Sequence, residues 1–261
     1  MKRVLVTIFL LLPLLIIQLS WGEIIESTTM KDLEKYVDKN TLLIFDLDNT
    51  IVAPAQTLGS DQWFEYNVKK YESRGLEKRA ATDKSIEDWS RVQNATAIKP
   101  VESVTPELII RFQNSGIKTM GLTARPPELA ETTLRQLSTI GVNLNRNSVL
   151  TTTPLNPSNG DFRFQNGIVF LGPRYSKGEV LVQFLKLNKL SPTKIVFVDD
   201  KEKHVKSVEA ELAKENIPYI GLRYGAADKD VKNFSKEISE VQWNVFNGIL
   251  SDEKAKTLLS K

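Results

Sequence analysis

Two aspartates stand one residue apart directly after an apolar run of the chain. Residues 42–45 are all apolar, and Asp46 and Asp48 follow them, with Thr50 close behind. An uninterrupted apolar run is typical of a strand buried on both faces of a parallel sheet. Ligands of open α/β sheets bind beyond the carboxyl ends of the strands, so both acids stand where such folds do chemistry. Two carboxylates this close repel each other unless a cation or a proton intervenes, which indicates a bound metal and separate roles for the pair.

Two further apolar segments end in polar residues. One ends at Thr123, with Arg125 just beyond it, and the other ends in Asp199 and Asp200. Lys177 opens a predicted helix after a loop that contains glycine and proline. Parallel strands bring their carboxyl ends to one rim, where gathered carboxylates favour a hard divalent cation, Mg²⁺ over zinc. A lysine and a hydroxyl beside such a cation would suit a phosphoryl group.

The elements that must position these residues alternate along the chain. An Asn166-Gly167 pair between apolar runs predicts a β-hairpin. Strand–helix alternation with short connections is typical of a parallel sheet covered by helices on both faces, so we expect a Rossmann-like three-layer α/β fold. Strands are predicted at 42–45, 117–122, 194–198 and 218–223, and helices at 105–114, 127–140, 176–190 and 201–216.

Residues 53–103 differ in composition from the rest of the chain, since they combine charged residues of both signs with several aromatic residues. Phe64, Val68 and Tyr71 recur at the spacing of one helix face. We expect a small helical cap here, inserted after the first pair of acids. Such aromatic residues more often form the core of a small domain than a platform for substrate. We expect this of Trp63, while for Trp89 both interpretations stay open.

Residues 1–22 have the features of a secretory signal peptide. Lys2 and Arg3 precede an apolar stretch at 4–19, and small residues follow it. The alternative is an uncleaved membrane anchor, but a spanning helix needs about 20 apolar residues and Pro13 interrupts this shorter run. We therefore expect cleavage and a periplasmic or secreted protein, with membrane association only if the segment is retained.

Composition narrows the function classes. Removing residues 1–22 takes away one lysine, one arginine and no acid, so the net charge falls from +3 to +1. The remaining residues contain no basic stripe, so nucleic acid is not an expected partner. The absence of cysteine excludes disulfides, thiol nucleophiles and thiolate metal sites. His204, the only histidine, is expected on an exposed helix, which disfavours a serine–histidine hydrolase. The other residues suffice for one core of 23–52 and 104–261 with a cap of 53–103.

The polar residues form an ordered set that resembles the four motifs of the haloacid dehalogenase superfamily. The order and spacing match across residues 41–225, and the set in order is far more specific than any single motif. The chain also resembles an exported, largely uncharacterised branch of this superfamily from bacteria that live inside host cells. This resemblance rests on the signal segment, on Phe45-Asp46-Leu47-Asp48-Asn49-Thr50 and on Lys177-Gly178-Glu179-Val180-Leu181. The motifs are Asp46-Leu47-Asp48-Asn49-Thr50, Leu122-Thr123, Lys177-Gly178 and Asp199-Asp200.

The resemblance implies an exported, Mg²⁺-dependent phosphomonoester hydrolase. Asp46 would be the nucleophile that forms an aspartyl-phosphate, and Asp48 the general acid and then the general base. The substrate would be a phosphorylated small molecule or a phosphoprotein. The resemblance implies phosphate binding by Thr123, Lys177, Asn49 and Arg125, and a metal site of Asp46, Asp48 through its backbone carbonyl, Asp199 and Asp200.

Several alternatives remain beside this interpretation. The fourth motif has adjacent acids, with Lys203 where a spaced second acid is expected, so the cation could have one direct carboxylate from this strand and Asp200 could act through water. Arg125 could pair with Glu128 instead of a ligand. The same site would serve a phosphotransferase or a phosphomutase. A catalytically silent binding module in the cell envelope, or one facing a host, is the third alternative.

Overall fold

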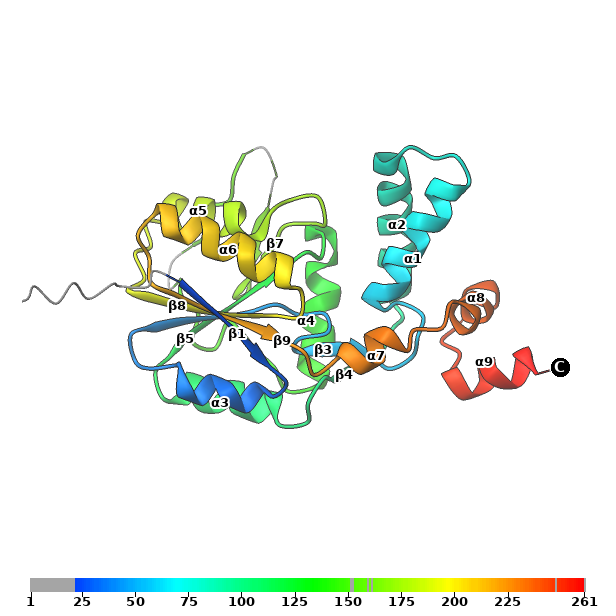
Figure 1. Cartoon of the computed structure of the whole chain (residues 1–261), viewed down its shortest axis with the longest axis horizontal. Coiled ribbons are helices and arrows are strands. Elements are labelled where there is room, and N and C mark those ends of the chain that lie inside the picture. Colours follow the sequence, from blue (N-terminus) through cyan, green and yellow to red (C-terminus); the bar gives the residue numbers. More distant parts are fainter. Residues whose placement is uncertain (1–21, 151–152, 159, 161, 247, 261) are drawn as a thin grey trace, which may run out of the picture.

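The structure is a computed structural model that describes residues 22–150, 153–158, 160, 162–246 and 248–260. The predicted signal peptide lies outside this description, except for Gly22. A seven-stranded sheet dominates the described chain, in the order β1-β9-β8-β2-β5-β7-β6, and only β6 runs antiparallel to its neighbour (Figure 1). The strands are β1 (Gly22–Ser27), β2 (Thr41–Phe45), β5 (Lys118–Thr123), β6 (Arg163–Gln165), β7 (Ile168–Phe170), β8 (Lys194–Asp199) and β9 (Tyr219–Tyr224).

The central strand β2 is buried along its whole length, and its side chains alternate between two apolar clusters. Leu43 and Phe45 belong to the cluster that includes residues of helices α3 and α4, whereas Leu42 and Ile44 belong to the cluster with α5 and α6. This alternation explains why the strand reads as a continuous apolar run, and it confirms the predicted three-layer α/β fold. The helices are α3 (Thr105–Asn114), α4 (Ala130–Thr139), α5 (Lys177–Leu187) and α6 (Glu202–Lys214).

The strand order places a crevice at the carboxyl end of β2. The strand β5 pairs with one side of β2, and β8 pairs with the other. The chain therefore crosses from one half of the sheet to the other between these neighbours, which is the topological switch point where open α/β sheets bind ligands. All three strands that precede the predicted site residues meet at this point.

Some elements differ from the sequence pattern. The edge strand β1 is not predicted, because two glutamates interrupt its apolar residues. The predicted hairpin is present, with Asn166 and Gly167 at φ values of 46° and 82°, and β7 extends the sheet from β5. The helix predicted at 127–140 begins with a short 3₁₀ turn, η2 (Pro127–Leu129), before α4. A second 3₁₀ helix, η1 (Met30–Lys35), precedes β2.

The insertion forms a pair of helices on a two-stranded base. Helices α1 (Asp61–Ser73) and α2 (Lys78–Gln93) stand beside the sheet domain in Figure 1, and strands β3 (Val52–Pro54) and β4 (Ile98–Pro100) pair antiparallel beneath them. Trp63 is completely buried in the cluster of the cap, as expected.

The end of the chain packs against the cap. Trp243 lies 5.3 Å from Trp63 between ring centroids, and Phe234 lies 6.1 Å from Tyr66. The Gln242 side chain accepts a 2.8 Å hydrogen bond from the backbone N–H of Leu58. The division of the chain into core and cap stays a prediction, but these contacts connect part of 104–261 to the cap. The helices concerned are α7 (Asp228–Lys232), α8 (Lys236–Asn244) and α9 (Asp252–Leu259).

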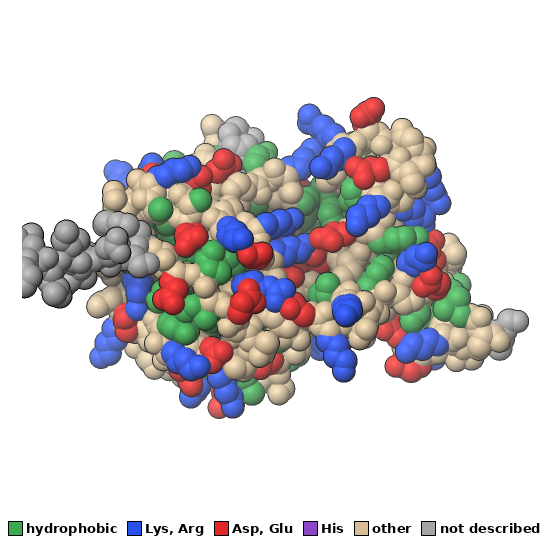
Figure 2. Space-filling view, viewed as in Figure 1, with side chains coloured by type: hydrophobic (Ala, Val, Ile, Leu, Met, Phe, Trp, Pro, Cys, Tyr) green, Lys and Arg blue, Asp and Glu red, His purple; other side chains and the backbone are tan. Residues whose placement is uncertain are grey.

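The surface carries both signs of charge. Figure 2 shows lysine and arginine side chains interspersed with aspartate and glutamate on the face in view, over the core and the cap alike. In the part of the chain that the structure describes, no helix is both long enough and apolar enough to span a bilayer.

Candidate active site

The loop after β2 folds back on itself and directs Asp46 into the crevice. The backbone carbonyl of Leu47 accepts the N–H groups of Thr50, Ile51 and Val52 at 3.2, 2.9 and 2.9 Å. Asn49 adopts a left-handed conformation with φ of 59°, which asparagine tolerates better than most residues. The tight turn keeps both acids at the end of the strand.

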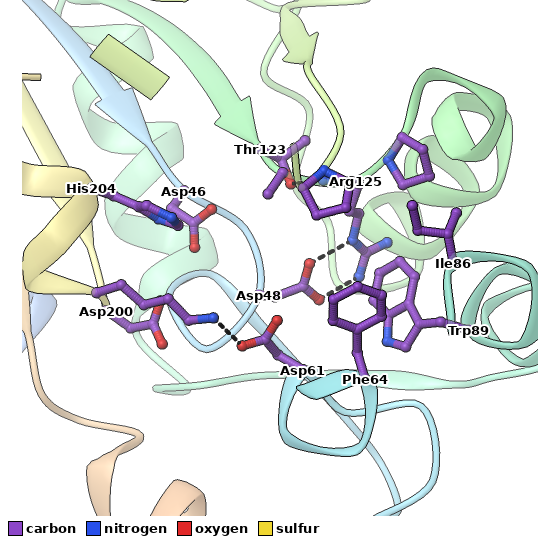
Figure 3. A pocket seen from close by; sticks show the side chains of 14 residues that line it. Asp46, Asp48, Asp61, Phe64, Ile86, Trp89, Thr123, Arg125, Asp200 and His204 are labelled. Carbon is purple, nitrogen blue, oxygen red and sulfur yellow. Dashed lines mark hydrogen bonds and ion pairs between the residues drawn. The ribbon is translucent and has the colours of Figure 1, made fainter. Parts of the chain in front are cut away.

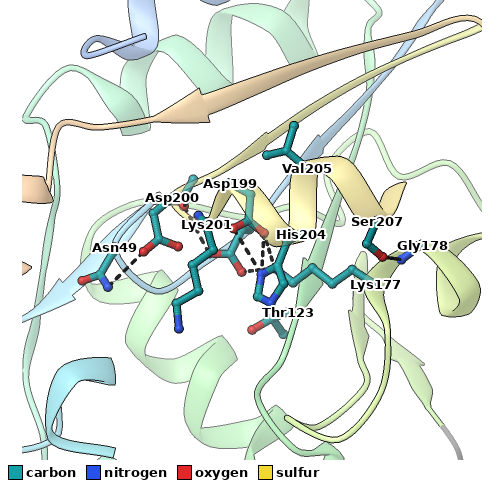
Figure 4. Close-up of polar contacts among 12 residues, drawn as sticks. Asn49, Thr123, Lys177, Gly178, Asp199, Asp200, Lys201, His204, Val205 and Ser207 are labelled. Carbon is teal, nitrogen blue, oxygen red and sulfur yellow. Dashed lines mark hydrogen bonds and ion pairs between the residues drawn. The ribbon is translucent and has the colours of Figure 1, made fainter. Parts of the chain in front are cut away.

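Lys177 joins the acids from two neighbouring strands. Its Nζ donates to Oδ1 of Asp46 at 2.5 Å, and the lysine is only 1% exposed. The same Nζ donates to Oδ2 of Asp199 at 2.6 Å, and Figure 4 shows Lys177 and Asp199 together. Lys177 starts helix α5, whose N-cap Ser176 accepts from Glu179 N. Gly178 lets this helix approach α6, because an added Cβ would lie 2.1 Å from the backbone oxygen of Ser207. Lys177 therefore supplies the positive charge between the two acids, and Gly178 allows the close packing of α5 on α6.

The buried charges shift one another's pKa values. Burial, with the charges of Asp199 and Asp48 adding to it, raises the pKa of Asp46 to about 7 against the opposing charge of Lys177. Burial and then the charges of Asp46 and Asp199 raise the pKa of Asp200 to about 9. Burial would also raise the pKa of Asp199, but the Lys177 ammonium and the contact with His204 outweigh it and lower that pKa to about 2. Asp46 and Asp200 therefore keep their protons to higher pH than free aspartates do, because the three acids in their ionised form would carry more negative charge than Lys177 neutralises.

The donor set of this cluster suits a hard divalent cation. Asp46, Asp199 and Asp200 each offer one carboxylate oxygen, and these oxygens all lie within 4.8 Å of one another. Oxygen-only ligands are the preference of Mg²⁺, and a bound cation would offset the excess of buried negative charge. The adjacent acids of the fourth motif therefore both reach the place where a metal would bind.

Asp48 points away from this cluster and pairs with Arg125. Both carboxylate oxygens accept from the guanidinium at 2.8 Å, in a forked arrangement visible in Figure 3. The alternative in which Arg125 pairs with Glu128 is therefore wrong. Arg125 is 3% exposed and also donates to Thr133 at 3.0 Å and to Gln136 at 2.7 Å. The candidate acid is thus held by a buried arginine that also bonds to two residues of α4.

The remaining predicted phosphate ligands lie at the same rim. Thr123 is buried at the end of β5, and its hydroxyl accepts from the backbone N–H of Arg125 at 3.1 Å. The side chain of Asn49 donates to Asp200 at 3.3 Å, so it contacts an acid in this structure. Five predicted site residues line one pocket, and Lys177 and Asp199 bond to each other beside its Asp46: the five are Asp46, Asp48, Thr123, Arg125 and Asp200. Asn49 reaches Asp200 but lines a neighbouring pocket, and Asp48 and Arg125 form a pair of their own.

The cap forms the roof of the pocket over this crevice. Lys201 of the core pairs with Asp61 at 2.6 Å and with Glu65 at 2.8 Å, both on the first turns of α1. Trp89 from α2 lies over Arg125, with 5.4 Å between the ring centroid and the guanidinium carbon. The pocket is lined by Asp46, Asp48, Asp61, Phe64, Ile86, Trp89, Thr123, Ala124, Arg125, Pro126, Pro173, Asp200, Lys201 and His204 (Figure 3).

Some residues of the site have no assigned role in the sequence interpretation. Thr50 donates to Asp46 at 3.1 Å and accepts from the backbone N–H of Asp200 at 3.2 Å, and its place in the first motif is the signal that could have indicated this role. His204 is half-buried with Nδ1 3.1 Å from Asp199, so its expected place on an exposed helix face is wrong. Lys201 and Asp61 meet across the pocket, and neither has a motif that would indicate it.

Relatives of the chain occur in species of Chlamydia and Rickettsia. A protein of Chlamydia pneumoniae named "Putative outer membrane protein" is 30% identical over 224 residues, which cover 86% of this chain and 84% of that relative. An uncharacterized protein of Rickettsia prowazekii is 29% identical over the full length of both chains.

Solved structures and a family model also match. A haloacid dehalogenase-like hydrolase of Streptococcus pneumoniae covers 70% of this chain and 94% of its own, with a TM-score of 0.42 and 14% identity. A model of the family described as "Protein of unknown function (DUF2608)" matches residues 26–256. The chain therefore belongs to this family.

Proposed function

We propose that the protein is an exported, Mg²⁺-dependent phosphomonoester hydrolase that works through a phosphorylated Asp46. The observation that supports this best is the meeting of Asp46, Lys177, Asp199 and Asp200 beside Thr123 at the switch point of the sheet. A carboxylate nucleophile, a buried ammonium and a set of hard oxygen donors in one crevice are what phosphoryl transfer requires.

The reaction would take place in two displacements at phosphorus. First, a carboxylate oxygen of Asp46 bonds to phosphorus as the ester oxygen leaves, and Asp48 gives that oxygen a proton. Next, a water oxygen bonds to phosphorus while Asp48 takes a proton from the water, and the bond to Asp46 breaks to release inorganic phosphate. Thr123 and Lys177 would hold the phosphoryl oxygens. Mg²⁺ held by Asp46, Asp199, Asp200 and the carbonyl of Asp48 would supply positive charge there.

These two reaction steps require Asp48 to leave its partner Arg125. Its two oxygens accept from Arg125 before substrate arrives, so neither is free to meet a leaving group. A phosphoryl dianion suits the fork of a guanidinium as well as a carboxylate does. Substrate binding can therefore take over Arg125 and release Asp48, which must then take up a proton from water before it acts as the acid. This exchange gives Arg125 its predicted role as a phosphate ligand.

The Asp48–Arg125 pair also supports a second candidate function. If this pair never opens, the crevice would bind phosphate groups without turnover, as a binding module does. The rate of phosphate release distinguishes the two candidates, because only the enzyme would release phosphate faster than uncatalysed hydrolysis in water does.

Export is part of the proposal. The charged start and the apolar stretch of residues 1–22 support it, and so do the names of the chlamydial relatives. Expression of the full chain in a Gram-negative host should yield a mature protein that begins at Glu23. A protein that keeps Met1 in the cytoplasmic fraction would contradict this part of the proposal.

Phosphate release from an aryl phosphate with Mg²⁺ tests the activity. We expect turnover by the wild type and none by Asp46→Asn. Glu34→Gln, which changes an exposed acid that pairs with Arg111, is the control and should keep full activity. An Asp46→Asn protein as active as the wild type would reject the mechanism, whereas a wild type that binds phosphate without hydrolysing any ester would favour the binding module.

A further inference from the structure

The wall of the pocket that belongs to the cap is apolar. Phe64 of α1 and Ile86 and Trp89 of α2 face the crevice, and the core loops add Pro126 and Pro173 (Figure 3). The acids Asp46 and Asp200 line the same pocket from the core. A ligand whose phosphoryl group meets the acids would therefore place the rest of the molecule against hydrocarbon and aromatic rings.

The polar groups that the cap does bring to the pocket already have partners. Trp89 Nε1 donates to the backbone oxygen of Ser60 at 3.3 Å, and Asp61 pairs with Lys201 at 2.6 Å. Hydroxyl groups of a sugar placed against Phe64, Ile86 and the Trp89 ring would lose water without gaining hydrogen bonds there, which is unfavourable. The lining thus discriminates against polyhydroxylated leaving groups.

The aromatic wall begins immediately beside the reacting centre. The Trp89 ring covers Arg125 at 5.4 Å, and the same arginine donates to Asp48 at 2.8 Å. Phe64 meets Trp89 edge to face at 6.3 Å and 73°, so the two rings form a corner. The part of the substrate that lies in this corner is the group bonded directly to the ester oxygen, and a flat ring can contact both aromatic residues there.

We propose that this site takes phosphate monoesters of aromatic alcohols, with the ring of the leaving group against Phe64, Ile86 and Trp89. The inference rests on the proposed function and names its substrate class. A free aryl phosphate and a phosphorylated tyrosine of a peptide share this chemistry. A nucleotide differs, because ribose separates its ring from the ester oxygen.

Binding of phosphonates tests the inference without any dependence on turnover. We expect the wild type to bind phenylphosphonate at least tenfold more tightly than propylphosphonate in calorimetry with Mg²⁺. Phe64→Leu should reduce this preference at least threefold. Tyr66→Leu is the matched control, because Tyr66 lies on the same helix but packs on Phe234 and does not line the pocket. Equal affinity of the wild type for both phosphonates would overturn the inference.

Turnover separates this inference from the proposed function. We compare, between variants, the ratio of kcat/KM for phenyl phosphate to kcat/KM for glucose 6-phosphate. The phenyl ester has the better leaving group, but this advantage is the same for every variant and so does not affect the comparison. Phe64→Leu and Ile86→Ser should lower the ratio, and Tyr66→Leu should not. Hydrolysis with an unchanged ratio would overturn the substrate class and leave the function standing. Tight phenylphosphonate binding without hydrolysis of any ester would keep the class and refute the function.

A phosphotyrosine peptide and phenyl phosphate distinguish the two sources of the aryl group. A higher kcat/KM for the peptide would assign the site to phosphoproteins, and a lower one to small molecules. Hydrolysis of adenosine monophosphate faster than both would contradict the placement of the ring next to the ester oxygen.

Discussion

Replacing Lys177 with methionine would remove the ammonium from between two buried carboxylates. Asp46 and Asp199 are 6% and 0% exposed, and both accept from this one group. Removing one partner of a buried ion pair costs about 3–5 kcal/mol, since it leaves the other charge without compensation. We therefore expect the free energy of unfolding to fall by about 3–5 kcal/mol, which at about 2–4 °C per kcal/mol for a domain of this size lowers the thermal midpoint by about 6–20 °C.

The assay is chemical denaturation of the metal-free protein near neutral pH. Lys186→Met is the matched control, because Lys186 lies on the same helix and forms an exposed pair with Glu215. Such exposed pairs contribute about 0–1 kcal/mol, so this variant should unfold nearly as the wild type does. Asp46→Asn should also stay close to the wild type in stability while losing activity, because it leaves Lys177 paired with Asp199.

Two results would refute this reasoning. A Lys177→Met protein within about 1 kcal/mol of the wild type would mean that the ammonium does not compensate the buried acids. The difference in free energy of unfolding between the wild type and Lys177→Met should also shrink as the pH falls, because protonation of Asp46, whose pKa is raised to about 7, removes part of the uncompensated charge. A difference that does not change with pH would refute the reasoning as well.

Gly178→Ala should lower the free energy of unfolding by about 1–3 kcal/mol, because its Cβ would lie 2.1 Å from Ser207 O, whereas Gly248→Ala meets nothing within 4 Å and should not. The raised pKa values of Asp46 and Asp200, about 7 and about 9 against 3.8, mean that the folded protein keeps protons that the unfolded chain has released. Without a divalent cation, the thermal midpoint should therefore fall as the pH rises from 3.8 towards 9, and Mg²⁺ should reduce the slope; a midpoint that rises would oppose this. Gln242→Leu removes a bond to Leu58 N and should speed hydrogen exchange in α8 while β2 stays protected; equal exchange in α8 would count against the packing of the tail on the cap.

The site residues that could be predicted are those that local pattern places at strand ends. Asp46, Thr123 and Asp199 each follow a buried apolar run, and parallel pairing brings the ends of such runs together whatever the details of packing. Lys177 follows from its N-capped helix start and its glycine neighbour. These features depend on a few adjacent residues, so the amino-acid sequence alone carries them.

The parts that could not be predicted depend on how helices and strands are placed relative to one another. Arg125 meets Asp48 across 77 residues, and its nearer neighbour Glu128 is the wrong partner. His204 reaches Asp199 only because helix α6 starts directly after β8 and turns that side chain inward. The pattern of apolar residues in the sequence does not indicate such contacts, since they follow from the packing of whole helices and strands.

The packing of the chain's end on the cap has a consequence for the order of events during synthesis. The two strand ends and the helix start that carry the acids and the lysine are complete once residue 200 is made, and domains tend to fold as they emerge during synthesis. The roof over them still lacks Phe234, Trp243 and Phe246, which pack on the cap's aromatic residues. A nascent chain would therefore contain its reactive side chains before the cap over them is fully packed. The packing of the last helices on the cap would then complete the covered pocket.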